Sequence, residues 1–242
     1  MVKVSGVWHM FFEVMNDATG KGDIGLATSA NGFDWQYQRI VLTEPFHLSY
    51  PYVFEWNDDY YMIPETLGAR VARIYRAEPF PDRWVYMKDL LPGDHADPSI
   101  FRFQDQWWMF TCPFPYKHDT LSLFYASDPL SAWTPHPHNP LISGDRRIAR
   151  PGGRVLQHDG ALIRLTQDCD PTYGRQLRAL QITELTANSY KEHERPESPI
   201  LTPSGSGWNS SGMHHADIHR LDDQSWIACV DGLWSSEGEP SH

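Results

Sequence analysis

The sequence has little of what metal, redox or membrane proteins usually carry. Its three cysteines, Cys112, Cys169 and Cys229, show no metal-ligand spacing, and we interpret them as small buried side chains in a reducing compartment. No Gly-rich phosphate loop and no Gly-x-Ser-x-Gly motif occurs. No apolar run reaches the roughly 18 to 20 residues that cross a bilayer, and no signal peptide is visible. A cytoplasmic protein without a membrane span is predicted.

Basic residues are also scarce. The 242 residues carry a formal charge of -11, from 20 Lys and Arg against 31 Asp and Glu. A nucleic-acid backbone requires a basic face that releases counterions, so nucleic acid is not an expected partner. Aromatic residues make up 13% of the chain and include 10 Trp. Such residues stack on sugar rings, but they also fill β cores, and composition leaves both explanations open.

A degenerate repeat runs through the chain. DPSIFRF followed by QDQWWMF, at 97–110, matches YPYVFEW followed by NDDYYMI, at 50–63. The stretches VWHMFFE, HHADIHRLDDQSWIACVDG and, more weakly, RPGGRVLQHDGALIRLTQDC fit the same template. Each copy predicts a β-hairpin, in which a short strand, a polar turn (SG, NDD, QDQ, HDG or DDQ) and an aromatic or apolar strand follow one another.

The repeat has a period of about 50 residues, as the third-strand positions Ile24, Ile74 and Leu123 illustrate. Five copies, each of three or four antiparallel strands, indicate an all-β protein with a five-bladed β-propeller fold. A sandwich is less suitable, because its strands have no such long period. We predict one propeller domain over 1–242, with blades at roughly 1–47, 48–92, 93–143, 144–206 and 207–242.

The first and last blades are expected to be incomplete. Met1 aligns with Val53 and Ile100, so the position equivalent to Asp97 would precede Met1, and too few residues follow Asp231 to finish the last blade. An unclosed blade leaves a strand edge that invites pairing with another chain. We therefore expect an oligomer to form through that edge.

Several of these motifs carry a resemblance to known families. IGLATSANGFDW, the DP-x-[IV]-F opening and the [WY]-x-M-F strand resemble the five-bladed propellers of glycoside hydrolase families 43 and 32. SYPYVFEWNDDYYMIPET, RPGGRV and QDCDPTYG resemble more closely the propeller domain associated with glucosamine inositolphosphorylceramide transferases and bacterial polysaccharide-cluster proteins. The resemblance implies a propeller fold and a carbohydrate-related function.

In a propeller, equivalent positions of successive blades form a ring around a central funnel. The ring position predicted here is occupied by Tyr50, Asp97, Arg150 and His215. A phenol, a carboxylate, a guanidinium and an imidazole in one pocket are typical of a sugar or anion site, and we predict that Tyr50, Arg150 and His215 bind substrate. The alternative is that these groups close the blade ends by hydrogen bonding to the backbone.

A second ring is predicted at the far end of the hairpins, and it consists of Glu13, Glu65, Cys112, Gln167, Asp168 and Asp231. Glu65 follows an apolar strand, where a low dielectric would raise its pKa as a general acid requires. It could equally form a salt bridge with Arg73 or Arg76. Glu13 and Gln167 are predicted to bind substrate, although a structural role is the stronger interpretation for Glu13.

The resembled hydrolases take catalytic carboxylates from the starts of blades one, three and four. Only Asp97 matches that pattern, because Arg150 stands at the blade-four position and the blade-one position would precede Met1. The catalytic prediction is therefore that Asp97 orients the sugar and that Glu65 or Asp168 donates the proton. Arg150 and His215 would bind hydroxyls or an anionic group.

Two functions remain open from the sequence. The one we favour is a carbohydrate-active, glycosidase-like enzyme that acts on a glycan in the funnel and requires no cofactor. The other is a non-catalytic glycan-binding or accessory propeller of a glycosyltransferase system, which Arg150 in place of the acid favours. The resemblance also implies a hydrated Ca²⁺ on the propeller axis near His215, although calcium prefers oxygen ligands. The HPH stretch at 136–138 is interpreted as a turn.

Overall fold

The computed structural model describes residues 1–234, and over this range the protein is built from β-strands. Its helical elements in that range are two 3-10 turns, η1 (Leu67–Ala69) and η2 (Gly207–Asn209), so none of its described helices is long and apolar enough to span a membrane. The chain divides into two compact units. Unit one comprises Met1–Pro98 and Ala126–Trp133, and unit two comprises Ser99–Tyr125 and the chain from Thr134 onward.

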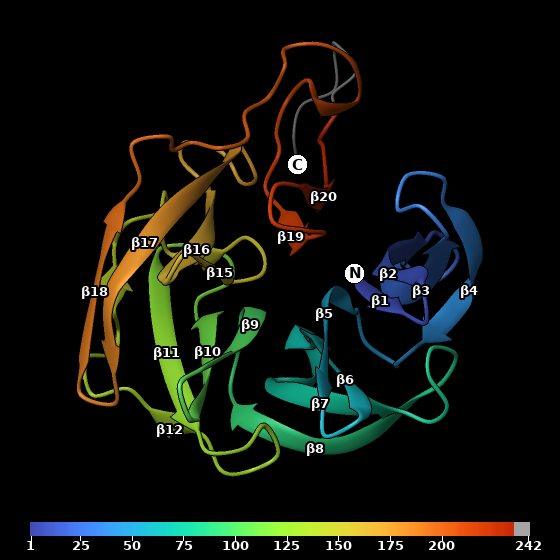
Figure 1. Ribbon diagram of the computed structural model, residues 1–242, viewed down its shortest axis with the longest axis horizontal. Helices are drawn as coiled ribbons and strands as arrows, with labels where there is room; N and C mark the ends of the chain where they lie inside the picture. Colours follow the sequence, from blue (N-terminus) through green and yellow to red (C-terminus); the bar gives the residue numbers. More distant parts are fainter. Residues whose placement is uncertain (235–242) are drawn as a thin grey trace. The chain divides into compact units, whose positions relative to one another are not determined.

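Unit one contains two four-stranded antiparallel sheets in which the strands follow the order of the chain (Figure 1). The first sheet consists of β1 (Val2–Val4), β2 (Val7–Asn16), β3 (Lys21–Ser29) and β4 (Gln36–Leu42). The second consists of β5 (Ser49–Trp56), β6 (Asp59–Glu65), β7 (Val71–Ala77) and β8 (Trp84–Pro92).

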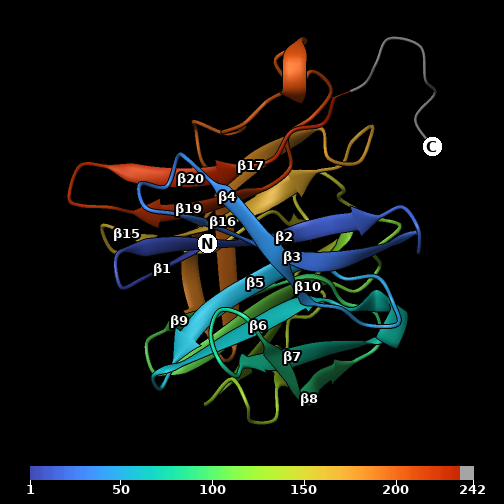
Figure 2. The same cartoon turned by 90° about the vertical axis from the view of Figure 1, so that its right-hand side faces the viewer.

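Unit two contains most of a five-stranded sheet, a second five-stranded sheet and a two-stranded sheet. The first consists of β9 (Ala96–Phe103, whose first residues belong to unit one), β10 (Gln106–Cys112), β11 (Thr120–Ala126), β12 (Thr134–Pro135) and β13 (Ile142–Ser143). The second consists of β14 (Arg150–Pro151), β15 (Leu156–His158), β16 (Ala161–Asp168), β17 (Gln176–Thr186) and β18 (Ser189–Glu194). The third pairs β19 (Ala216–Arg220) with β20 (Trp226–Val230), as Figure 2 also shows.

These sheets match the predicted repeat. Each lies within one of the five predicted segments, and the sequential antiparallel order is that of propeller blades. The first sheet has four strands, and its predicted shortening is confined to β1, which has 3 residues where β5 and β9 have 8. In the described part of the last segment the sheet has two strands, β19 and β20.

The polar turns predicted from the repeat form tight hairpins. Ser5 and Gly6 both have positive φ, as do Asn57 with Asp58 and Asp159 with Gly160. Two consecutive left-handed residues are the mark of a type I′ turn, whose twist suits a two-residue connection between antiparallel strands. The small and polar residues at these positions therefore determine the pairing register of their hairpins.

The Trp that follows the third strand of a repeat also has a structural role. Trp35 Nε1 donates to the carbonyl oxygen of Gly32 at 3.1 Å, and Trp133 Nε1 donates to that of Pro129 at 3.2 Å. In both repeats the indole thus closes the turn that precedes the fourth strand. Trp84, the equivalent residue of the second repeat, lies in the core of unit one with Phe11 and Tyr75.

Unit two encloses a charged group within its core. Arg164 of β16 is 1% exposed and forms two hydrogen bonds with the Glu192 carboxylate, from Nε at 2.9 Å and Nη2 at 2.7 Å. Nη2 also donates to the carbonyl of Ile148 at 2.9 Å, and the guanidinium lies over the Phe110 ring. Tyr190 donates its hydroxyl to Glu192 at 2.6 Å, and burial raises the pKa of Tyr190 well above its usual value. A buried charge of this kind is tolerated only when it is paired and hydrogen bonded.

Breaking this pair is expected to destabilise unit two strongly. Arg164→Met should lower the free energy of unfolding by about 3 to 5 kcal/mol, because Glu192 stays buried without its partner. The double variant Arg164→Met/Glu192→Leu should recover most of that loss, since no uncompensated charge remains. Urea denaturation followed by Trp fluorescence measures both.

The control is Arg220→Ala, which removes an exposed ion pair with Asp223 and should cost less than about 1 kcal/mol. If Arg164→Met cost no more than this control, the buried pair would not be a major source of stability.

Candidate functional site

Tyr50 and Asp97, the first-ring residues of unit one, share an unusual backbone conformation. Their φ values are 45° and 49°, in the left-handed region that residues with side chains seldom adopt. The β5–β6 pairing shifts register between Ser49 and Tyr52, which forms a bulge around Tyr50. Bulges and left-handed residues redirect side chains and are frequent at functional sites. The repeat predicted that the two positions are equivalent, and both residues indeed have the same left-handed backbone conformation.

Glu65, at the end of β6, is brought together with Asp97. Its side chain is buried, Oε2 accepts the backbone N–H of Asp97 at 3.1 Å, and Oε1 accepts the Ser49 hydroxyl at 3.2 Å. The alternative salt bridge is not formed, because Arg73 pairs with Asp89 and Arg76 with Asp59 and Glu78. Glu65 therefore holds the start of β9 against the end of β6.

Glu13 lies on β2 and faces a histidine. Its Oε1 is 3.4 Å from Nε2 of His47, and both side chains are partly exposed. The other ring nitrogen of His47, Nδ1, accepts the backbone N–H of Gly22 at 2.9 Å. This arrangement links the loop before β5 to the first sheet and favours the structural interpretation of Glu13.

In unit two, Asp168 is surrounded by donors. Its Oδ2 accepts from Gln176 Nε2 at 2.7 Å and from Arg178 at 2.8 Å (Nε) and 2.7 Å (Nη2), while Oδ1 accepts from the N–H of Asp170 at 3.0 Å. The side chain is 1% exposed. Both carboxylate oxygens accept from donors of the protein itself, so the geometry favours a structural role for Asp168 over the predicted role of proton donor.

Gln167 is also buried, and its side chain hydrogen bonds to the backbone of the protein. Its Nε2 donates to the carbonyl of Pro151 at 2.8 Å, and the neighbouring Thr166 hydroxyl donates to the carbonyl of Arg150 at 2.8 Å. Residues 166 and 167 of β16 thus bind both carbonyls of the short strand β14. The geometry favours a positioning role for Gln167, instead of the predicted contact with substrate, and it fixes the backbone that carries Arg150.

The guanidinium of Arg150 is held between a loop and an aromatic ring. Nη1 donates to the carbonyl of Pro115 at 2.9 Å and lies 2.8 Å from Nδ1 of His118. The guanidinium carbon is 5.0 Å from the centroid of Tyr173, whose ring also packs on His118. Because arginine can only donate, Nδ1 of His118 accepts this bond, which puts the proton of the neutral imidazole on Nε2.

A chain of polar groups continues from Tyr173. Nε2 of His214 lies 3.1 Å from the Tyr173 hydroxyl, and Nδ1 of His214 contacts the Asp231 carboxylate. Asp231 Oδ1 accepts the backbone N–H groups of His214 at 3.0 Å and His215 at 2.8 Å. Asp231 therefore orients the imidazole that faces Tyr173, and it also binds the backbone N–H of His215.

We call Arg150, His118, Tyr173, His214 and Asp231 the arginine cluster. It places the guanidinium of Arg150, a residue that is 7% exposed, and two imidazoles beside Tyr173, which is 42% exposed. This chemistry suits a ligand with an anionic group and a ring to stack. Arg150 and Asp231 were predicted from the repeat, whereas the roles of His118, Tyr173 and His214 were not. The available signals were QDCDPTYG, which contains Tyr173, and the histidine next to His215.

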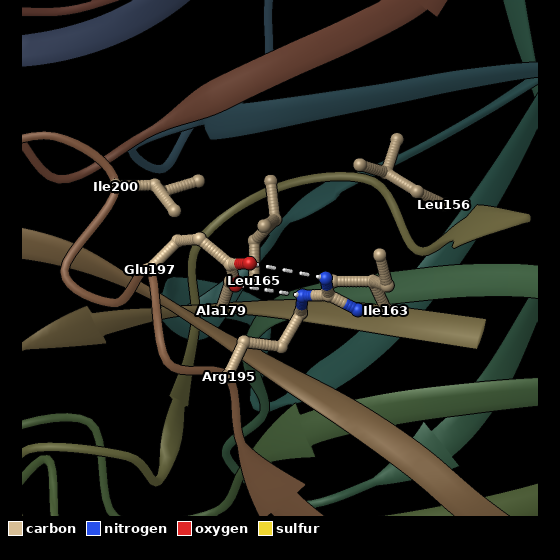
Figure 3. Close-up of a pocket in the computed structure, with 7 residues that line it drawn as sticks. All are labelled: Leu156, Ile163, Leu165, Ala179, Arg195, Glu197 and Ile200. Carbon is tan, nitrogen blue, oxygen red and sulfur yellow. Dashed lines mark hydrogen bonds and ion pairs between the residues drawn. The ribbon is translucent and has the colours of Figure 1, made fainter. Parts of the chain in front are cut away.

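A separate cleft in unit two has different chemistry. It has a volume of about 280 Å³ and is lined by Leu156, Ile163, Leu165, Ala179, Arg195, Glu197 and Ile200 (Figure 3). Its two charged side chains pair with one another, with Arg195 Nε 3.2 Å from Glu197 Oε2. An aliphatic cleft of this kind offers few groups for sugar hydroxyls, and none of the predicted site residues lines it.

The predicted calcium ion gains no support from the side chains. Within residues 1–234, no three His, Cys, Asp or Glu side chains are grouped so as to hold a metal. Calcium near His215 therefore stays a prediction from the resemblance.

Comparison with solved structures defines the class of protein. The catalytic domain of a GH62 α-L-arabinofuranosidase from Coprinopsis cinerea matches with a TM-score of 0.73, covering 99% of this chain and 84% of that one at 14% identity. At this identity the likeness establishes the fold, and the protein is an all-β propeller.

Sequence comparison then identifies the family. Residues 2–233 match the family described as glucosamine inositolphosphorylceramide transferase 1, N-terminal, and the chain belongs to it. The transferase of that name from Oryza sativa subsp. japonica is 36% identical over 232 residues, which cover 92% of this chain and 31% of the relative. A 1,2-beta-oligomannan phosphorylase from Thermoanaerobacter sp. is 31% identical over 104 residues, or 39% of this chain and 29% of that protein. The chain thus spans about a third of the length of the transferase it resembles.

Asp231 should make stability depend on acid pH. Burial would raise the pKa of its carboxyl, but the His214 imidazole and the N–H groups of His214 and His215 outweigh burial and lower the pKa below its usual value. A lowered folded-state pKa gives stability above the unfolded value of about 4, which is lost as pH falls through the folded value. Asp231→Asn should therefore be less stable than the wild type near neutrality.

The two unfolding free energies should converge as the pH falls below about 4, and urea denaturation across a pH series measures this. Asp105→Asn, in the exposed β9–β10 turn, is the control and should leave the wild-type profile unchanged. A constant gap between Asp231→Asn and the wild type down to acid pH would contradict the assignment.

Proposed function

We propose that this chain is a carbohydrate-binding propeller domain that recognises a sugar carrying an anionic group, and that the arginine cluster binds that group. The observation that carries the proposal is the setting of Arg150. Its guanidinium is fixed by Pro115 and His118 and lies over the partly exposed Tyr173 ring. A guanidinium is the side-chain group whose planar shape and charge best match a carboxylate or phosphate.

The negative net charge of the chain should make the site around Arg150 selective among anions. With a formal charge of -11, the protein repels anions in general, so a local arginine with imidazole neighbours distinguishes one anionic ligand from the surroundings. The names of the relatives, an inositolphosphorylceramide transferase and an oligomannan phosphorylase, both refer to carbohydrate chemistry, which supports a carbohydrate ligand.

A glycosidase is the second candidate, and the contact between Glu65 and Asp97 favours it. Two buried carboxylate residues meet at the start of β9, and Asp97 occupies the position that matches the resembled hydrolases. Against it, Asp168 is held by Arg178 and Gln176, and Arg150 occupies the position where those hydrolases carry an acid. Hydrolysis requires a carboxyl that can donate a proton to the leaving oxygen. Binding without cleavage is therefore the better-supported function.

Removing the guanidinium should abolish the preference for anionic glycans. On an array of uronate- and phosphate-bearing glycans with neutral counterparts, Arg150→Ala should weaken binding to the anionic members by about 1.5 to 3 kcal/mol, or roughly ten- to a hundredfold. Arg150→Lys should recover only part of this, because it keeps the charge without the planar fork. Calorimetry on the array hits gives the affinities.

The matched control is Arg147→Ala, which removes a nearby exposed arginine that bonds to Asp145. It should bind like the wild type. Wild-type affinity in Arg150→Ala would refute the anionic-ligand proposal.

The two candidate functions are separated by product analysis. We expect the wild type to leave its bound glycans intact over prolonged incubation, as followed by mass spectrometry. A cleavage product that disappears in Glu65→Gln and Asp97→Asn, with binding retained, would instead establish the glycosidase function.

A further inference from the structure

The loop between β10 and β11, which supplies Pro115 and His118 to the surroundings of Arg150, carries two exposed aromatic residues. Phe114 is 52% exposed and Tyr116 is 87% exposed, whereas Pro115 between them is buried. Single exposed aromatics are common on protein surfaces and need no explanation. Here the two residues flank Pro115, whose carbonyl accepts a hydrogen bond from Arg150, so their backbone is joined to the cluster.

The loop is held in one conformation by its backbone. The N–H groups of Lys117 and His118 both donate to the carbonyl of Phe114 at 3.0 Å, and Cys112 Sγ approaches the same oxygen at 3.6 Å. At the end of the loop, the N–H of Gly144 donates to the carbonyl of Asp119 at 2.8 Å. The exposed rings therefore project from a fixed backbone, which lowers the entropy cost of binding against them.

The loop also carries one cation and one carboxylate, Lys117 and Asp119. Lys117 Nζ lies 5.6 Å from the centroid of Phe114 and adds a second cation to that of Arg150. The acidic neighbour in the loop, Asp119, accepts a hydrogen bond from the Thr120 hydroxyl at 2.8 Å. An anionic ligand bound at Arg150 would thus meet aromatic faces and a further positive charge along the loop.

We infer that Phe114 and Tyr116 form a stacking subsite next to the arginine cluster, so that the ligand is an oligosaccharide, not a single sugar. The terminal anionic sugar binds at Arg150 and Tyr173, and the following sugars stack on the rings of the loop. The inference rests on the proposed function, because the cluster supplies the anchor. The apolar faces of sugar rings pack on aromatic side chains, which contribute area at little conformational cost.

Affinity as a function of ligand length tests this. The probes are glucuronate and glucose 6-phosphate, each as the free sugar and as the terminal residue of a tetrasaccharide, measured by calorimetry on the full chain. The wild type should bind each tetrasaccharide more tightly than the free sugar. Tyr116→Ala and Phe114→Ala should each weaken tetrasaccharide binding by roughly three- to tenfold, while affinity for the free sugars stays unchanged.

Two controls separate this inference from the proposed function. Arg150→Ala should lose both the free sugars and the tetrasaccharides, whereas Phe33→Ala, which removes a ring that is 75% exposed in unit one, should change neither. Equal binding of free sugar and tetrasaccharide by the wild type, or equal losses for both in Tyr116→Ala, would overturn the stacking subsite and leave the anion site standing. Failure of the wild type to bind any of the probes would overturn both.

Discussion

A carboxylate stands at or just after the end of the second hairpin strand in three of the sheets, and it must be hydrogen bonded. This requirement fixes the segments that surround the predicted site residues. Glu65 ends β6, Asp168 ends β16 and Asp231 directly follows β20. A carboxylate removed from water is costly unless donors replace the water. Each of the three therefore gathers N–H or side-chain donors, and in doing so fixes a neighbouring segment: the start of β9, the start of β17 or the residues before β19.

The carboxylate at this position of the repeat therefore has a different role in each sheet. Glu65 binds a backbone N–H and a serine, while Asp168 is neutralised by an arginine. Asp231 orients His214 and, through it, faces Tyr173. The scaffold requires only that each carboxylate be satisfied. Which donor satisfies it decides whether a strand end is purely structural or also faces a ligand, and in unit two the outcome is a guanidinium, a phenol and imidazoles in one cluster.

Sequence reasoning recovered the scaffold more completely than the site. The turn residues, the third-strand Trp positions and the equivalence of Tyr50 with Asp97 all follow from local chemistry that each repeat contains. The partners of Glu65 and Asp168 were not predictable in the same way. Arg73 and Arg76 were plausible partners of Glu65 by proximity in the chain, but both are taken by other carboxylates. His118 and Tyr173 lie in loops, where no repeat defines an equivalent position.

The sequence by itself determined that the chain is a repeating all-β propeller, because alternating apolar strands and left-handed turn residues are local properties written in each copy. It also placed Arg150 at the start of a repeat, where β14 begins. Only the tertiary structure decided what Arg150 contacts, since Pro115, His118 and Tyr173 come from segments far apart in the chain. Hydrogen bonds and ring packing depend on distances of a few ångströms between side chains, and folding, not spacing in the sequence, determines those distances.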